Sequence, residues 1–308
     1  MIRIPMSGMA ASVRVHNCDL AVACDWIESW VLFCDEEVSW SDIRDVLLEQ
    51  QVYRDQDFAD EFIASMWREL RQRITWLEKS SPIRMEGDRL TPKITAKEAV
   101  AYAFMLTVSL APHFREWSKH FGADYTLQGE LFERLVEDAF SSIFPGWIVY
   151  RTGWSTDNTS KLSDVLNKLA EAIGAGVGDI EKWASARANE CGLDLVCFRQ
   201  FADSRPAIPI YLAQCATGSN WTHKLDTPNT KTWSRLIEFP QTPGKIFAIP
   251  FALDSRGHFQ RSNHSDAVLL DRYRLLYAGE SNAEWQSQTF RSLANQWLEP
   301  RIEWLRDD

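Results

Sequence analysis

The chain has 308 residues, 45% of them hydrophobic, and carries a formal net charge of -10. This length allows one large or two modest domains with a sizeable core, and the composition excludes a disordered chain. The negative charge argues against a protein that holds nucleic acid by bulk charge alone, although a local basic cleft or a metal-bridged contact is compatible with it.

The N-terminal segment MIRIPMSGMAASVRV lacks the sustained apolar core of a signal peptide. No stretch of the sequence approaches the roughly 18 apolar residues of a membrane span. The six cysteines form no CxxC pair and show no zinc-ligand spacing with histidine, and several lie in apolar runs, as reduced core cysteines do. We therefore expect a cytoplasmic protein with no membrane attachment.

The first part of the chain is predicted to be mostly helical. Apolar residues recur at helical spacing in four segments: DLAVACDWIESWVLF, SWSDIRDVLLEQ, FADEFIASMWRELRQRITWLEK and TAKEAVAYAFMLTVSLAP. Ser39 is the expected cap of the second, Thr95 with Glu98 the expected cap of the fourth, and Pro112 marks its end. The short connection RMEGDRLTP is typical of a small hairpin. We predict a mainly helical N-terminal domain over residues 1–127.

The pattern changes after residue 128. QGELFERLVEDAFSSIF predicts a helix, GWIVYRTGW a strand, and SKLSDVLNKLAEAIG and IEKWASARANE two further helices. LDLVCFRQF and IYLAQCA predict two paired strands, followed by a helix at KTWSRLIEF and a strand at KIFAIPFAL. DAVLLDRYRLLYA is a strand or a short helix, and the chain ends in a helical region. This order predicts an α/β domain over residues 128–308.

Three polar residues stand out in this second domain. Glu133 lies on the acidic side of the first helix, where a solvated face is the simplest interpretation. Asp194 interrupts an apolar run, and an unpaired buried carboxylate is costly, so it needs a partner, a metal or the exposed end of an edge strand. Gln214 ends an apolar strand about 20 residues later, where a core amide bonded to the backbone is the alternative.

Together these residues offer the oxygen ligands that hard cations such as Mg²⁺ prefer. The segment GELFERL at 129–135, the strand with Asp194 and the segment QCA at 214–216 resemble the restriction-endonuclease-like PD-(D/E)xK superfamily. The resemblance covers roughly residues 128–280 and leaves the helical N-terminal domain unexplained. It implies a mixed sheet flanked by helices and metal-dependent cleavage of phosphodiester bonds.

By this resemblance, each candidate residue acquires a role. Glu133 would orient the metal site, Asp194 would be the central ligand, and Gln214 would stand where the family carries Glu or Gln. The backbone carbonyl of Cys215 would be a further ligand, and the ion would be Mg²⁺ or Mn²⁺. Glu190 is either an extra ligand or a helix-end acid.

The sequence departs from the family pattern at Ala216, where a lysine is expected. That lysine would polarise the scissile phosphate or help to deprotonate water. Its charge has either migrated, with Lys224 as the nearest candidate, or been lost, which would leave a site that only binds. Lys182 and Arg187 are other candidates for the charge, and His223 is a candidate proton carrier.

Three functions follow from these observations. The first is a metal-dependent nuclease acting on DNA, in a bacterial antiphage-defence or genome-maintenance system, with a protein partner or as a homo-oligomer. The second is a catalytically degenerate nuclease-like subunit that binds nucleic acid or a protein partner. The third makes the tryptophan-rich N-terminal helices an interaction module, against the simpler explanation of core packing. Arg272 and Arg274 would share one side of a strand, facing either a phosphate backbone or solvent.

Overall fold

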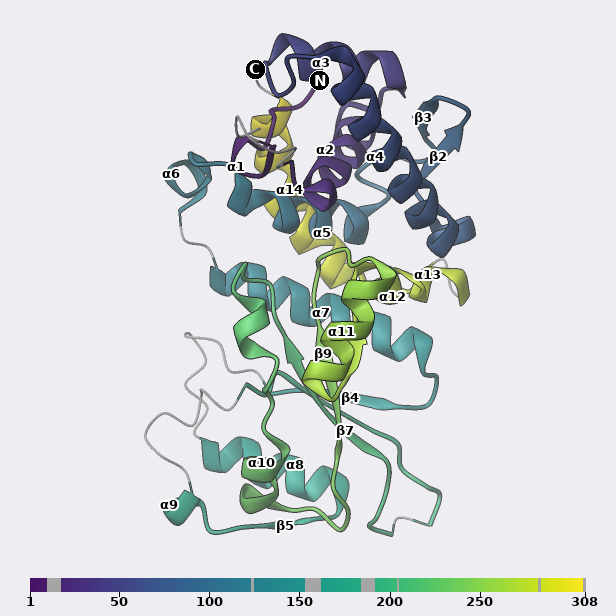
Figure 1. Ribbon diagram of the computed structural model, residues 1–308. Coiled ribbons are helices and arrows are strands. Elements are labelled where there is room, and N and C mark those ends of the chain that lie inside the picture. The colour runs from purple at the N-terminus through teal and green to yellow at the C-terminus, as the bar shows by residue number, and fades with distance from the viewer. Residues whose placement is uncertain are drawn as a thin grey trace. The chain divides into compact units, whose positions relative to one another are not determined.

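The computed structural model describes residues 1–9, 18–122, 125–152, 162–183, 192–203, 205–281 and 284–306 (Figure 1). The chain forms two compact units. Unit 1 comprises Met1–Ala123, Pro250–Ala252 and Gln286–Asp308, and unit 2 comprises Asp124–Ile249 and Leu253–Trp285. The sequence placed all residues after 128 in one domain, whereas the chain returns to unit 1 at its C-terminal end. No helix in the described ranges combines the length and apolarity that a membrane crossing requires.

Unit 1 is mainly helical, as predicted. Its helices are α1 (Met6–Met9), α2 (Leu20–Cys34), α3 (Trp40–Glu49), α4 (Gln56–Leu77), α5 (Val100–Leu110), α6 (Trp117–Phe121) and α14 (Gln288–Arg306). The predicted hairpin is confirmed as β2 (Ile83–Glu86) and β3 (Arg89–Pro92), which an antiparallel β1 (Val38–Ser39) extends. Ser39 caps α3 in a capping box with Asp42. Glu98 accepts from the Thr95 backbone and hydroxyl, but in a turn before α5.

The C-terminal helix completes the core of unit 1. Phe104 of α5 meets Phe290 and Trp297 of α14, with ring centroids 6.1 and 5.2 Å apart in edge-on geometry. The backbone N–H of Arg3 donates to the carbonyl of Leu305 at 2.8 Å. Segments from both ends of the sequence therefore build this unit.

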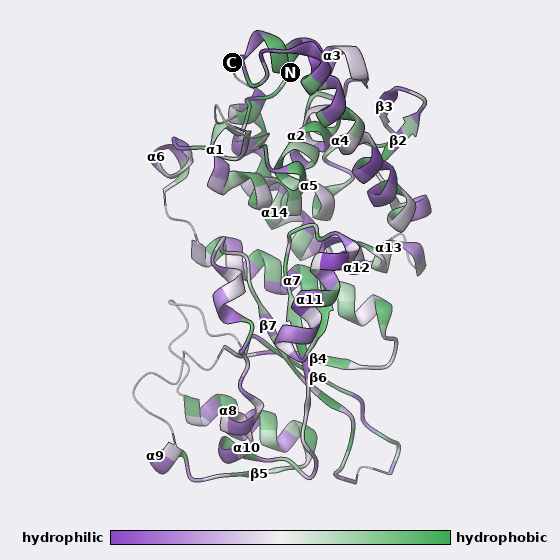
Figure 2. Ribbon diagram, viewed as in Figure 1, coloured by the Kyte–Doolittle hydropathy of each residue, from purple (hydrophilic) through white to green (hydrophobic). Residues whose placement is uncertain are grey.

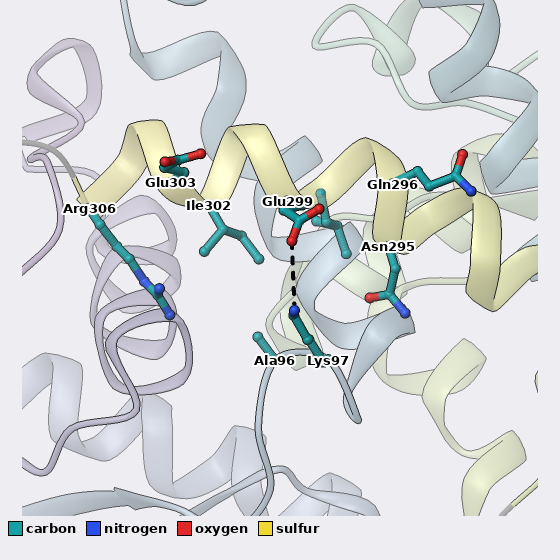
Figure 3. Close-up of a pocket in the computed structure, with 9 residues that line it drawn as sticks. Ala96, Lys97, Asn295, Gln296, Glu299, Ile302, Glu303 and Arg306 are labelled. Atoms are coloured by element: carbon teal, nitrogen blue, oxygen red, sulfur yellow. Dashed lines mark ion pairs between the residues drawn. The ribbon is translucent and has the colours of Figure 1, made fainter.

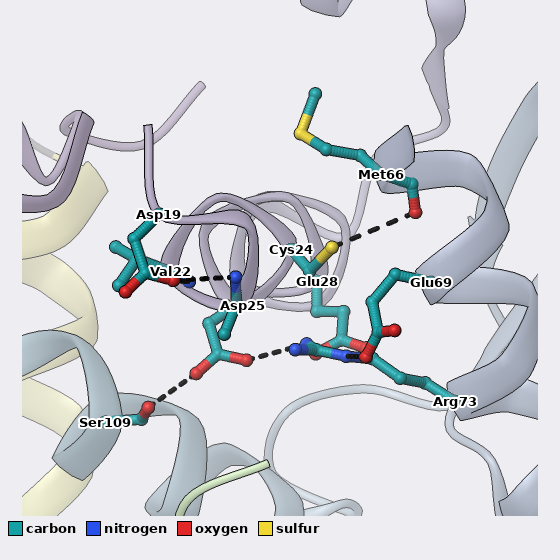
Figure 4. A network of polar contacts seen from close by, with 10 residues as sticks. Asp19, Val22, Cys24, Asp25, Glu28, Met66, Glu69, Arg73 and Ser109 are labelled. Atoms are coloured by element: carbon teal, nitrogen blue, oxygen red, sulfur yellow. Dashed lines mark hydrogen bonds and ion pairs between the residues drawn. The ribbon is translucent and has the colours of Figure 1, made fainter. Parts of the chain in front are cut away.

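A buried charged network ties α2 to α4 in unit 1 (Figure 4). The Arg73 guanidinium, 1% exposed, donates to Asp25 at 2.8 Å, Glu28 at 3.2 Å and Glu69 at 3.0 Å. Ser109 of α5 donates to the other oxygen of Asp25 at 2.5 Å. Charges this deeply buried require such partners, so Arg73 is the central link among these helices.

Unit 2 is built on a five-stranded mixed sheet in the order β10-β9-β7-β6-β4. The strands are β4 (Ile148–Arg151), β6 (Leu195–Phe198), β7 (Ile210–Cys215), β9 (Gly244–Ala248) and β10 (Val268–Leu270). β4, β6 and β7 run antiparallel, whereas β7, β9 and β10 run parallel. The predicted pairing of the strands in LDLVCFRQF and IYLAQCA is therefore confirmed as β6 with β7.

Helices flank this sheet (Figure 1). They are α7 (Tyr125–Ile143), α8 (Leu162–Ile173), α9 (Ile180–Trp183), α10 (Thr230–Leu236), α11 (Ser255–Ser265), α12 (Arg272–Leu276) and α13 (Ala278–Ser281), with a small pair β5 (Gly176–Val177) and β8 (Ile237–Glu238). Apolar residues of α8, α10, β6 and β7 form one buried cluster. The described part of unit 2 is thus a mixed α/β fold, as the sequence predicts.

The predicted arrangement of Arg272 and Arg274 is wrong. The segment DAVLLDRYRLLYA divides into β10 and α12, so both arginines lie on a helix instead of a strand. Arg272 is fully buried, and Arg274 donates to the carbonyl of Leu269 at 3.1 Å. The N-cap Asp271, which accepts from the Arg274 backbone, starts the helix immediately after the strand.

Candidate functional site

Helix α7 places Glu133 on its polar side. Leu131, Leu135 and Val136 are buried on the other side, which sets the rotation of the helix. The Glu133 side chain is 20% exposed, and its Oε2 lies 4.0 Å from Nε of Arg151 on β4. Arg151 also lies within 4.0 Å of the carboxylates of Glu130 and Glu137. The acidic side of α7 therefore faces Arg151. A face that only contacts solvent would not have such a partner.

Asp194 directly precedes β6, an interior strand between β4 and β7. The edge-strand interpretation of this residue is therefore wrong. Its Oδ2 accepts from the backbone N–H of Cys215 at 2.6 Å and from Nε2 of Gln214 at 2.6 Å. These two donors fix the carboxylate against the end of β7.

The backbone around Asp194 is held from both neighbouring strands. Its N–H donates to Ala213 at 2.9 Å, and its carbonyl accepts from the Thr152 N–H at 3.0 Å. The Thr152 hydroxyl lies 2.9 Å from the carbonyl of Leu193 and 3.1 Å from that of Asp194. Ordered strand backbone on both sides makes this a rigid position for a functional carboxylate.

Gln214 is buried, at 7% exposure, and its amide orientation is set by its neighbours. Nε2 faces two acceptors, Oδ2 of Asp194 and, at 3.3 Å, the carbonyl of Cys215. Oε1 of Gln214 lies against Gly192, whose φ is +56°. A Cβ added at Gly192 would clash with this oxygen and would come within 2.6 Å of the Cβ of Thr227. Gln214 was predicted to offer its oxygen to a cation; here it offers nitrogen to Asp194 and acts as an anchor.

The site is short of positive charge. Burial and the nearby Asp194 raise the pKa of Glu133 to about 8, and Arg151 opposes this only in part. Burial raises the pKa of Asp194 to about 6. The hydrogen bond from the Cys215 N–H and the charge of Lys224 lower this pKa and so oppose the effect of burial. Raised pKa values in two interacting carboxylates are typical of sites that take up a proton or a cation.

The candidates for the missing lysine charge differ in their placement. Lys224 ends the 3-10 helix η4 (Trp221–Lys224) with its side chain exposed, and its charge reaches Asp194. Among the described residues no cation lies within 4.0 Å of the Asp194 carboxylate. Lys182 lies over the ring of Trp183 at 5.0 Å, and His223 is exposed. Arg187 and Glu190 lie outside the described residues.

Sequence reasoning missed three contributors to this site: Arg151, Thr152 and Gly192. The first two end the segment IVYRT, and their importance depends on the register that sets Arg151 opposite Leu195. Gly192 lies two residues before Asp194. Of the three residues, it alone carries a sequence signal, because a glycine lets another group pack closely against the backbone. Strand register is a tertiary property, so the other two carried no local signal.

The oxygen donors present fit a hard cation in kind. Glu133 and Asp194 supply carboxylates, and the Cys215 carbonyl is adjacent. Oδ1 of Asp194 accepts no hydrogen bond from the part of the chain described here. No group of three or more His, Cys, Asp and Glu side chains gathers in metal-binding geometry within those same ranges, so any such site depends on backbone, amide or water oxygens as well.

A separate groove of about 630 Å³ lies in unit 1, away from these residues in sequence (Figure 3). It is lined by Ala96, Lys97 and one side of α14. Lys97 and Glu299 pair across it at 3.7 Å with side chains 81% and 71% exposed. Such an open, charged groove contains none of the predicted site residues.

The residues brought together in unit 2 are therefore Glu133, Asp194, Gln214 and Cys215, with Arg151 beside them and Lys224 at longer range. This grouping joins the ends of β6 and β7 to the polar side of α7. No protein-family model, curated protein or solved structure compared with this chain matches it.

Proposed function

We propose that unit 2 is a metal-dependent nuclease domain of the restriction-endonuclease-like type. One observation carries the proposal: Glu133 and Asp194, 61 positions apart in the numbered sequence, lie close enough that the charge of Asp194 raises the pKa of Glu133, and both carboxyl groups are largely buried. The order of α7, β4, the β6–β7 hairpin, α10 and β9 supports it, because this is the helix, strand, hairpin, helix and strand order that the sequence resemblance implies.

In this proposal, Glu133, Asp194 and the carbonyl of Cys215 would hold Mg²⁺ or Mn²⁺. When bound, such a cation would lower the pKa of a water and offset negative charge on a phosphodiester. The amide of Gln214 and the N–H of Cys215 donate to Oδ2 of Asp194 and so leave Oδ1 as the carboxylate oxygen available to a ligand. Arg151 keeps the three glutamates of α7 from repelling one another.

Lys224 takes the place of the lysine that the family motif has two residues after Gln214. Ala216 at that position is 1% exposed, so a lysine there would have to bury its stem. Lys224 lies on η4 with an exposed side chain that can approach a phosphate while its charge reaches Asp194. The substrate we propose is DNA, within a bacterial antiphage or genome-maintenance system in the cytoplasm, with a protein partner.

The test is cleavage of labelled DNA by the purified full chain with Mg²⁺ or Mn²⁺. We expect Asp194→Asn to abolish cleavage, Glu133→Gln to reduce it at least about 100-fold, and Lys224→Ala to reduce it about 10- to 100-fold. Glu171→Gln is the control, because Glu171 is exposed on α8 and is not one of the candidate residues. Equal cleavage by wild type and Asp194→Asn would contradict the assignment.

A degenerate, binding-only domain is the second candidate, and one observation favours it. The Gln214 amide nitrogen donates a hydrogen bond to Oδ2 of Asp194, so the amide oxygen points away from that carboxylate and toward Gly192. Calorimetric titration with Mg²⁺ separates the two. Uptake that Asp194→Asn removes supports the nuclease, whereas no uptake by the wild type supports the binding-only domain.

A further inference from the structure

Helix α11 is unusual in an acidic protein. Its 11 residues, SRGHFQRSNHS, include two arginines and two histidines but no aspartate or glutamate. Only Ser265 among them is buried, so core packing does not explain why the helix has this composition. Figure 2 draws its ribbon largely in the colour of hydrophilic residues.

Five exposed side chains of α11 form one stripe. Arg256, Phe259, Gln260, Asn263 and His264 follow the spacing i, i+3, i+4, i+7 and i+8, which places them on one side of a helix. All five are exposed, and Phe259 at 72% is the most exposed of the large hydrophobic residues in the described chain. The opposite side holds His258, whose ring contacts the carbonyl of Leu269, and Ser265.

Arg261 is also exposed and lies beside this stripe, about 60° around the helix from His264. The guanidinium of Arg261 lies 5.7 Å from the ring centroid of Trp221, which begins η4. Lys224 ends the same short helix, and its charge reaches Asp194. Neither Arg256 nor Arg261 forms an ion pair with another described residue. Arg261 on α11 and Lys224 on η4 therefore lie on neighbouring segments, which the contact of Arg261 with Trp221 joins.

We propose that this surface, α11 with η4, binds single-stranded DNA. Arg256, Arg261 and Lys224 contact phosphates, and an unpaired base stacks on Phe259. The three basic side chains favour a polyanion. The exposed Phe259 ring favours single-stranded DNA, because its unpaired bases can stack on an aromatic side chain. The inference rests on the proposed nuclease function for its biological meaning, but the binding it describes needs neither a metal nor cleavage.

Fluorescence anisotropy of a labelled oligothymidine strand with the full chain in EDTA tests the proposal. We expect Phe259→Ala to weaken binding about tenfold, within the range of base–aromatic stacking. Arg256→Ala should weaken it and lower the slope of log affinity against log salt by about 1, because one phosphate contact is lost. The matched controls are Phe201→Ala and Arg205→Ala, which change side chains of unit 2 that are 57% and 82% exposed on another segment.

Unchanged affinity in Phe259→Ala and Arg256→Ala would overturn the proposal. Equal or tighter binding of duplex DNA or of RNA would overturn the choice of single-stranded DNA, and displacement by a polyglutamate peptide would indicate an acidic protein instead. Cleavage is assayed separately in Mg²⁺. If the α11 variants lose binding while the wild type shows no cleavage, the nuclease function fails and this surface stands. If cleavage depends on Asp194 while the α11 variants bind normally, the nuclease function stands and the proposed binding surface fails.

Discussion

Replacing Glu133 with glutamine should stabilise the protein at alkaline pH. The folded-state pKa of Glu133 is raised to about 8 from an ordinary 4.5, so the folded protein retains a proton that the unfolded chain has released. The stabilising effect of this proton is complete below about pH 4.5 and is lost as the pH rises through 8. Glutamine has nearly the same shape and no charge, so it escapes this loss.

The size of the effect follows from the shift. A difference of about 3.5 pH units at ~1.4 kcal/mol per unit corresponds to about 5 kcal/mol above pH 8. The carboxylate is 20% exposed, and water that reaches it reduces the penalty, so we expect Glu133→Gln to gain roughly 2 to 4 kcal/mol near pH 8 and almost nothing near pH 4.5. Functional residues often reduce the stability of a protein, and the ionised form of Glu133 has this effect.

Urea denaturation of both proteins, followed by far-UV circular dichroism and by hydrogen exchange in α7, measures the difference between about pH 4.5 and 8.5. Glu171→Gln is the control and should change the free energy of unfolding by no more than about 0.5 kcal/mol at any pH, because its side chain is exposed on α8. A stability difference between Glu133→Gln and wild type that does not grow with pH would refute the reasoning.

Three further outcomes are expected. Arg73→Ala should lower the free energy of unfolding by about 3–5 kcal/mol in a urea titration, because it removes the guanidinium among Asp25, Glu28 and Glu69, whereas the exposed Arg84→Ala should cost under about 1 kcal/mol. Gly192→Ala should cost about 2 kcal/mol or more and reduce Mg²⁺ uptake, since its Cβ would displace the Gln214 amide; a normal melting temperature would count against this. Thr152→Val should cost about 1 kcal/mol through its lost hydroxyl and slow cleavage more than Thr126→Val, a change on the exposed start of α7.

Sequence periodicity predicted most of the elements of unit 2 but less of the site. The stripe of Leu131, Leu135 and Val136 set the rotation of α7, and two apolar runs of suitable spacing predicted the β6–β7 hairpin. These are local patterns. The approach of Arg151 to Glu133 depends on the register of β4 against β6, which no local pattern encodes.

The misplaced features have similar causes. Arg272 and Arg274 looked like one side of a strand because the apolar run before them is continuous, yet the cap at Asp271 starts a helix there. The orientation of the Gln214 amide depends on Asp194 and Gly192, which the fold brings to it from another strand. The C-terminal helix carried an amphipathic pattern that predicts burial, but a pattern of this kind does not name the surface against which the helix packs.

The position of α14 in unit 1 bears on the order in which the protein folds. Phe104 and the backbone of Arg3 find their partners Phe290, Trp297 and Leu305 only near the end of the sequence. A ribosome therefore releases the strands and helices of unit 2 before unit 1 can close its core, which reverses the usual N-terminal-first order of domain folding. During synthesis, the early helices expose apolar surface until α14 has been made, so chaperone dependence should persist to the end of translation.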